Sequence, residues 1–195
     1  MAENQLYSPG GDRLYLTLEE RDAFYQASVD ARDHEARTFC RCLYFTGCRI
    51  SEALELPRSR VDFAAQTLTF RTLKKRGTKP HWRSVPIPAS FLDELDLVHE
   101  LRRSRRKDTD LLWPMSRATG WRIVREVLER AEIDLSKPFA SPKGLRHAFG
   151  VACVLKGVPL PTLQKWMGHA KLDTTGIYLQ IVGAEERELA ARLWE

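Results

Sequence analysis

Apolar residues recur at helical spacing through most of this chain. Val124, Val127 and Leu128, for example, are three and four positions apart and would share one face of a helix. The same spacing, read together with the residues that begin and end helices, predicts a mainly helical chain. Helices are expected over residues 17–28, 34–46, 50–56, 89–103, 121–131, 142–156, 161–168, 184–194, and from residue 173 through Tyr178.

Several helix ends carry specific signals. Thr17 and Glu20 form a capping box, in which each side chain bonds the backbone N–H of the other residue. Ser141 followed by Pro142 is typical of a helix start, because proline suits the first turn. Gly47 predicts the end of the helix over residues 34–46.

Two segments have the character of strands. Thr67–Leu73 is rich in β-branched and aromatic residues, and Arg83–Ile87 is the expected returning strand after a turn at Gly77. Pro86 and Pro88 place the second strand near an edge or near its end. The fold class is therefore α+β, mainly helical with a small antiparallel β-sheet.

Composition limits the possible function classes. The 195 residues are 43% hydrophobic, which is enough for the core of one domain and argues against disorder. The net charge of +5 suits a polyanionic partner. Residues 1–15 are polar and are expected to form a flexible leader. Neither a signal peptide nor an apolar run of membrane-spanning length is present, so we expect a soluble, cytoplasmic protein with no membrane partner.

The cysteines predict no metal site. They form no C-x-x-C pair, and histidines do not accompany them at the spacing of a zinc ligand set. Free thiols in a core fit a reducing compartment. The four residues are Cys40, Cys42, Cys48 and Cys153.

The last quarter of the chain carries the candidate chemistry. Lys143 and Arg146 are three residues apart and would share a helix face. His169 follows a helix-ending glycine, and Tyr178 comes nine positions later. Cations can neutralise a phosphoryl group as it gains charge, and a tyrosine hydroxyl can form a covalent intermediate. These residue types point to attack on a phosphodiester.

Arg49 completes a pattern that resembles a known family. It lies in Thr46-Gly-Cys-Arg-Ile-Ser-Glu52, upstream of Lys143-Gly-Leu-Arg-His147 and Met167-Gly-His169. In order and spacing, from about Leu16 to the C-terminus, these motifs resemble the catalytic domain of tyrosine recombinases, also called phage integrases. One difference is Lys143, where the family has histidine; lysine is also found there in type IB topoisomerases, which share the catalytic fold.

The resemblance implies a role for each residue of the pattern. Tyr178 would be the nucleophile and would form a 3′-phosphotyrosine link, leaving a free 5′-hydroxyl. Arg49 and Arg146 would hold the non-bridging phosphate oxygens, because a guanidinium binds phosphate in two places and keeps its charge. Lys143 would donate to the phosphate or the attacking oxygen, and His169 would hydrogen-bond a non-bridging oxygen. Cationic side chains would replace a metal, so no cofactor is expected.

The family also uses a hairpin lysine as general acid for the leaving oxygen. Lys74 is the preferred candidate here and Lys75 is its rival; in a strand these neighbours point to opposite faces. Glu52 either supports Arg49 or forms an ordinary helix salt bridge with it. His147 is interpreted as structural packing.

The hairpin is expected to contact DNA, because in the family it enters the minor groove. The candidate phosphate contacts are Lys75, Lys79, His81 and Arg83.

The expected function is site-specific recombination on double-stranded DNA. A topoisomerase-like enzyme that relaxes DNA and a catalytically silent DNA-binding regulator are the alternatives. Residues 16–183 would form the catalytic domain. The chain would be either a single-domain recombinase, without a separate N-terminal DNA-binding domain, or a fragment of a longer one. Residues 184–195 would form a helix that either packs on its own domain or docks on a neighbouring subunit, as in the family. The expected assembly is a monomer in solution and a homotetramer on DNA.

Overall fold

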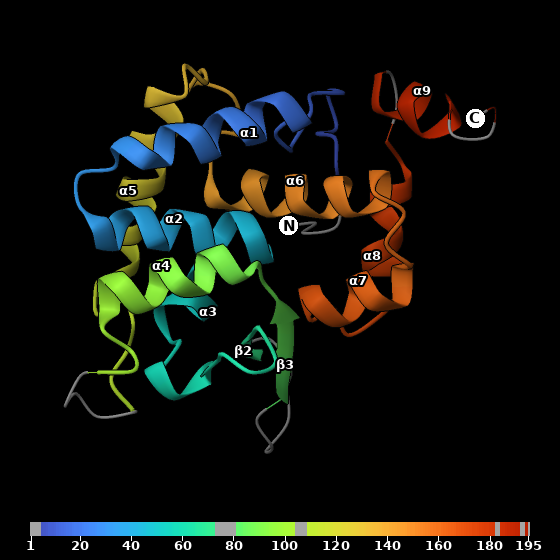
Figure 1. Cartoon of the computed structure of the whole chain (residues 1–195). Coiled ribbons are helices and arrows are strands. Elements are labelled where there is room, and N and C mark those ends of the chain that lie inside the picture. The colour runs from blue at the N-terminus through green and yellow to red at the C-terminus, as the bar shows by residue number, and fades with distance from the viewer. Residues whose placement is uncertain (1–4, 73–80, 104–108, 182–183, 192–193, 195) are drawn as a thin grey trace.

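The computed structural model describes residues 5–72, 81–103, 109–181, 184–191 and 194. Within these ranges the chain is mainly helical and contains a small antiparallel sheet, as the apolar pattern predicts (Figure 1). The helices are α1 (Leu18–Ala27), α2 (His34–Thr46), α3 (Ile50–Leu54), α4 (Ala89–His99), α5 (Arg117–Arg130), α6 (Pro142–Leu155), α7 (Leu160–Met167), α8 (Asp173–Gly176) and α9 (Ala184–Ala191). The strands are β1 (Val61–Asp62), β2 (Thr67–Thr72) and β3 (His81–Pro86), and three short 3-10 helices are η1 (Ser28–Asp30), η2 (Arg58–Arg60) and η3 (Ile177–Leu179).

Helix α6 lies among the other helices and contacts α1, α2, α7, α9 and η3 (Figure 1). Every residue from Gly144 to Leu155 is buried. The helix begins as predicted, with the Ser141 side chain accepting a hydrogen bond from the Gly144 N–H at 3.2 Å. Among the described residues, no helix is both long and apolar enough to cross a membrane.

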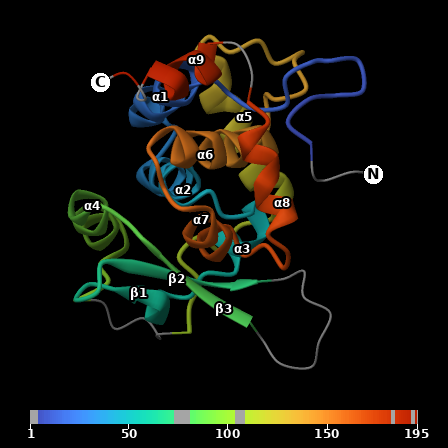
Figure 2. The same ribbon diagram turned by 90° about the vertical axis from the view of Figure 1, so that its right-hand side faces the viewer.

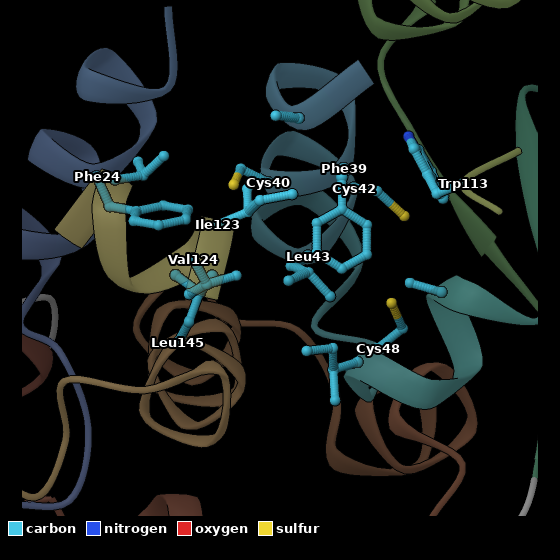
Figure 3. Close-up of a cluster of buried hydrophobic side chains, with 14 of the residues drawn as sticks. Phe24, Phe39, Cys40, Cys42, Leu43, Cys48, Trp113, Ile123, Val124 and Leu145 are labelled. Atoms are coloured by element: carbon cyan, nitrogen blue, oxygen red, sulfur yellow. The ribbon is translucent and has the colours of Figure 1, made fainter. Parts of the chain in front are cut away.

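A large core joins α1, α2, α5 and α6 (Figure 3). Two of its aromatic members, Phe39 and Trp113, contact edge to face, with ring centroids 5.6 Å apart. Burial of each large apolar side chain stabilises the fold by about 1.5–3 kcal/mol. The labelled members of the cluster are Phe24, Phe39, Cys40, Cys42, Leu43, Cys48, Trp113, Ile123, Val124 and Leu145, and all four cysteines of the chain are free and buried.

The described part of the N-terminal segment differs from the predicted flexible leader. Leu6 and Tyr15 are each only 1% exposed and belong to a second core cluster, which also contains Tyr178. Tyr7 and Arg13 form an antiparallel bridge that folds the segment back on itself. The leader prediction is therefore wrong for residues 5–15, because isolated apolar residues in a polar segment are enough to anchor it to this cluster.

The sheet has the order β1-β2-β3 and lies along one side of the helices (Figure 2). β3 is an edge strand and ends at Pro86, as the prolines predict. In the antiparallel pairing of β2 with β3, Phe70 lies opposite Arg83. Residues that lie opposite each other point to the same face, so Arg83 shares the buried face of Phe70.

Candidate active site

The structure brings five of the predicted catalytic residues into one cleft with a volume of about 370 Å³. Arg49 precedes α3, Lys143 and Arg146 lie on α6, His169 follows α7, and Tyr178 lies in η3. Four separate parts of the chain therefore meet at one place. Across the described ranges, His, Cys, Asp and Glu side chains form no group of three or more that could hold a metal ion.

Arg146 is held in place by the ends of two helices. Its Nη1 donates to the carbonyl of Gly47 at 2.7 Å, and its Nη2 donates to the carbonyl of Met167 at 2.7 Å. Gly47 ends α2 in the left-handed conformation, with φ 55°, and Met167 is the last residue of α7. The carbonyls at a helix C-terminus favour a cation. Burial, and then the charge of Arg49, lowers the pKa of Arg146 to about 10, so this guanidinium is charged at neutral pH.

Glu52 positions Arg49 through both backbone and side chain. Its carboxylate accepts from the Arg49 N–H at 2.8 Å and from Arg49 Nη1 at 3.0 Å. The Glu52 side chain is fully buried, unlike an ordinary ion pair on a helix surface. Burial alone would raise the pKa of Glu52, but Arg83, Arg146 and Arg49 outweigh burial and hold this pKa below its usual value. These contacts favour the supporting role over the ordinary salt bridge.

Arg83 is an internal residue, so the prediction that it contacts DNA is wrong. It is 3% exposed, and its Nη2 donates to Glu52 at 2.7 Å. Its Nε donates to the Trp166 carbonyl at 2.7 Å and its Nη1 to Thr72 at 3.2 Å. The strand register turns this side chain inward, where it connects β3 to Glu52 and to α7.

We expect Arg83→Ala to lower the free energy of unfolding by about 3–5 kcal/mol, the range for removing one partner of a buried ion pair. Urea unfolding would measure it. Arg71→Ala is the matched control, because Arg71 is exposed on the adjacent strand β2; its unfolding free energy should change by less than about 0.5 kcal/mol. Normal stability with weakened DNA binding in Arg83→Ala would instead make Arg83 a DNA contact.

His169 is held as a neutral imidazole. Its Nε2 lies 3.0 Å from Arg146 Nη2, and its Nδ1 lies 3.0 Å from Thr175 Oγ1. A guanidinium only donates, so Nε2 accepts and Nδ1–H donates to Thr175. Burial, followed by the charges of Arg146 and Arg49, lowers the pKa of His169 to about 3. Donation from His169 to a phosphate oxygen stays a prediction, because in the free protein Nε2 accepts from Arg146.

The low pKa makes His169 a source of acid instability. Between about pH 3 and 6.5 the unfolded chain binds a proton at this residue and the folded chain does not, so stability falls as the pH falls below 6.5. The loss from one such group is at most about 1.4 kcal/mol per pH unit. We expect His169→Gln to lose less stability than the wild type between pH 8 and pH 5, measured by urea unfolding. Equal losses in both proteins would contradict a neutral His169.

Tyr178 reaches the cleft across a glycine of α6. A Cβ at Gly150 would lie 2.4 Å from the tyrosine ring, so only glycine leaves room for it. The ring stacks on His169, with centroids 6.3 Å apart and an interplanar angle of 13°. Tyr178 is 1% exposed, and this burial raises its pKa to about 12, although Arg146 and Arg49 act in the opposite direction. The hydroxyl therefore holds its proton at neutral pH and must lose it to attack.

His147 and Thr175 have contacts in the site that the sequence does not predict. His147 was interpreted as packing, but its Nδ1 lies 3.2 Å from the Tyr178 hydroxyl, and it lines the same cleft. Its position directly after Arg146 was the available signal. Thr175 was not singled out either, although it is fully buried against His169.

The remaining predicted residues are less closely defined. Lys143 lines the cleft and is exposed. His81 is exposed on β3, and its contact with DNA stays a prediction. The outer wall of the cleft includes Arg117 and the half-exposed Trp121, both on α5. Three predicted residues lie outside the described ranges: Lys74, Lys75 and Lys79.

Comparison with known proteins identifies the class to which this fold and cleft belong. The model of the phage integrase family matches residues 15–184, so the chain belongs to this family. It is similar to the tyrosine recombinase XerA of Pyrococcus furiosus, with 33% identity over 159 residues, 77% of this chain and 51% of the relative. The chain spans about half the length of the curated relatives that it matches.

Solved structures show the same fold. The crystal structure of XerA recombinase matches with a TM-score of 0.78 and 24% identity, over 96% of this chain and 66% of that one. The XerH site-specific recombinase in its post-cleavage complex with a palindromic difH substrate matches with a TM-score of 0.75 and 23% identity, over 92% and 53%. The predicted fold class, a tyrosine recombinase catalytic domain, is confirmed.

Proposed function

We propose that this protein is a site-specific recombinase that cuts and rejoins double-stranded DNA through a 3′-phosphotyrosyl intermediate. The observation that carries the proposal is the meeting of Tyr178, Arg146, Arg49, His169 and Lys143 in one cleft. A nucleophile beside two fixed guanidinium groups suits attack on a phosphodiester, because charge develops on the phosphoryl oxygens as the bond to the nucleophile forms.

The hydrogen bonds of the free site indicate how a phosphate would be held. Arg146 donates one hydrogen bond from Nη1, to Gly47, and two from Nη2, to Met167 and His169. The guanidinium has five N–H donors, and these three bonds use three of them, so two N–H groups are left to donate to a substrate. Glu52 occupies one side of Arg49, whose side chain is 24% exposed and can offer its other donors to DNA. The arginines are thus oriented before the substrate arrives.

The relatives support DNA as the partner and recombination as the outcome. The curated relative named above is a tyrosine recombinase, and the XerH structure is a complex of a recombinase with its DNA substrate. Neither a DNA-relaxing enzyme nor a silent regulator is favoured by these similarities. The presence of all five residues in the cleft also argues against a silent regulator.

A plasmid experiment tests the proposal. Supercoiled plasmid with two copies of the DNA flanking the protein's own gene would be incubated with the protein, without added metal and with a chelator. We expect covalent protein–DNA adducts and recombinant plasmids. Relaxed plasmid with adducts but without recombinants would support the topoisomerase instead, and DNA binding without adducts would support the regulator.

The general acid is proposed to be Lys74, with Lys75 as the alternative. We expect Lys74→Ala to cleave slowly on normal DNA and at nearly the wild-type rate on DNA whose 5′ leaving oxygen is replaced by sulfur, because a thiolate leaves without a proton. Adduct formation on both substrates measures this. If the sulfur substrate rescues Lys75→Ala and not Lys74→Ala, the general acid is Lys75 instead.

We also propose that the protein is a monomer in solution and a tetramer on paired sites. Trp194 is 79% exposed, so its ring is accessible to a neighbouring subunit. Head-to-tail contacts of this kind close into a ring when the rotation between subunits permits it. In the plasmid experiment, the mass of the complex on paired sites tests this proposal; a complex no larger than the protein on one site would contradict it.

A further inference from the structure

The Tyr178 hydroxyl has a neighbour that can take its proton. His147 Nδ1 lies 3.2 Å from Tyr178 Oη, within reach of a hydrogen bond. The two ring centroids are 5.9 Å apart, and both residues line the cleft. His147 is 4% exposed, so water has little access to this contact.

We propose that His147 is the general base that accepts the Tyr178 proton during DNA cleavage and returns it during rejoining. The inference rests on the proposed recombinase function and adds a catalytic residue to it. It also assigns a chemical role to His147, which the sequence alone indicates only as a packing residue.

The other groups in the cleft are poorly placed for this role. A lysine ammonium such as that of Lys143 only donates hydrogen bonds and has no lone pair for the proton. His169 uses Nε2 for Arg146 and Nδ1 for Thr175. Its ring also lies nearly parallel to the tyrosine ring, at 13°, and stacks on it. His147, in contrast, presents a ring nitrogen to the hydroxyl.

Lys143 and His147 lie at different depths on helix α6. Lys143 and His147 are four residues apart and lie one helical turn from each other on the same side of α6. Lys143 is exposed and can reach the DNA, whereas His147 is buried beneath it beside the nucleophile. One helix face therefore offers a donor to the substrate and an acceptor to the tyrosine.

The proposed step balances in protons and electrons. For Nδ1 to accept, His147 carries its ring proton on Nε2. As Tyr178 Oη forms the bond to phosphorus, its O–H bond breaks and the proton passes to Nδ1. The bond between phosphorus and the 5′ oxygen breaks, and that oxygen leaves with the electron pair and takes a proton from the hairpin lysine. Rejoining reverses both transfers.

His147→Gln and His147→Ala test the inference on the DNA site found in the plasmid experiment. Glutamine keeps a side chain that can accept a hydrogen bond from Tyr178 but cannot take up its proton. We expect both variants to bind DNA as the wild type does and to form adduct about 10²-fold or more slowly, the scale of losing a general base. If His147→Ala does not fold, His147→Gln still gives this comparison.

Rescue with small bases separates proton transfer from packing. Added imidazoles should restore adduct formation by His147→Ala, and the more basic imidazoles should restore it faster, because the rate of base catalysis follows base strength. His99→Gln is the matched control: His99 is also 4% exposed, but it bonds Thr38 and is not among the residues that line the cleft. Its adduct formation should be normal and unaffected by imidazole.

Two results would overturn the inference. One is adduct formation at the wild-type rate by His147→Gln. The other is a slow His147→Ala variant that imidazoles do not rescue, or rescue equally whatever their basicity, since His147 would then act by packing. If the wild-type protein itself forms no adduct, the proposed recombinase function fails first.

Discussion

Tyr178→Phe is expected to abolish covalent attachment to DNA while the protein still folds and binds DNA. Phenylalanine keeps the ring that packs over Gly150 and stacks on His169. Only the hydroxyl, with its hydrogen bond to His147, is lost. A ring without oxygen cannot form the phosphotyrosyl bond, so no adduct should remain on a denaturing gel. Gel-shift titration should give a dissociation constant within about fivefold of wild type, since a hydrogen bond contributes about 1 kcal/mol and 1.4 kcal/mol is a tenfold change in affinity.

Tyr15→Phe is the matched control for this substitution. Tyr15 is also 1% exposed, belongs to the same core cluster, and hydrogen-bonds through its hydroxyl, at 3.1 Å from the hydroxyl of Tyr7. Tyr15 is not among the residues that line the cleft, so adduct formation should continue at the wild-type level. Adduct from Tyr178→Phe at the wild-type level would show that another residue is the nucleophile.

Local signals predicted much of the helical framework. The Thr17–Glu20 capping box, the left-handed Gly47 and the Ser141-Pro142 start all lie where they were expected. These signals depend on hydrogen bonds within a few residues, so sequence is enough to find them. α4 instead ends at His99, earlier than the predicted residue 103, because Glu100 adopts a left-handed conformation with φ 51°. No glycine or proline marks that position.

The motif residues were predictable, but their partners depended on contacts distant in sequence. His147 contacts Tyr178 across 31 residues, and this contact exists only because η3 packs on α6 at Gly150. The sequence around His147 contains no local signal that predicts its contact with Tyr178.

Arg83 shows a different reason for a wrong prediction. The sequence predicts a DNA contact at Arg83 only through the resemblance to the family, whose hairpin enters the minor groove. The strand register instead places it beside Phe70, and its charge is satisfied by Glu52, 31 residues away. The sequence predicts the pairing of the two strands. The alternation of side chains between the two faces of β3 therefore already placed Arg83 on the same face as Phe70. The buried carboxylate that makes the inward orientation stable was not visible in the strands themselves.

The alanine variants of Arg49 and Arg146 should differ in stability, although we propose the same catalytic role for both arginines. Arg146→Ala and Arg49→Ala are each expected to slow adduct formation by about 10²-fold or more, the scale of losing a donor to the transition state. Arg146→Lys should also be slow, because one ammonium cannot replace the bonds to Gly47 and Met167 and still bind phosphate in two places.

Urea unfolding should separate the two alanine variants. Arg146→Ala leaves two buried helix-end carbonyls without their donor, at a cost of about 1–3 kcal/mol for each unsatisfied group. Arg49→Ala leaves Glu52 paired with Arg83, and the side chain lost is 24% exposed, so its stability should fall less. Cleavage at a near-normal rate by either variant would place the phosphate clamp elsewhere. Equal losses of stability would show that the carbonyl contacts of Arg146 contribute little to the fold.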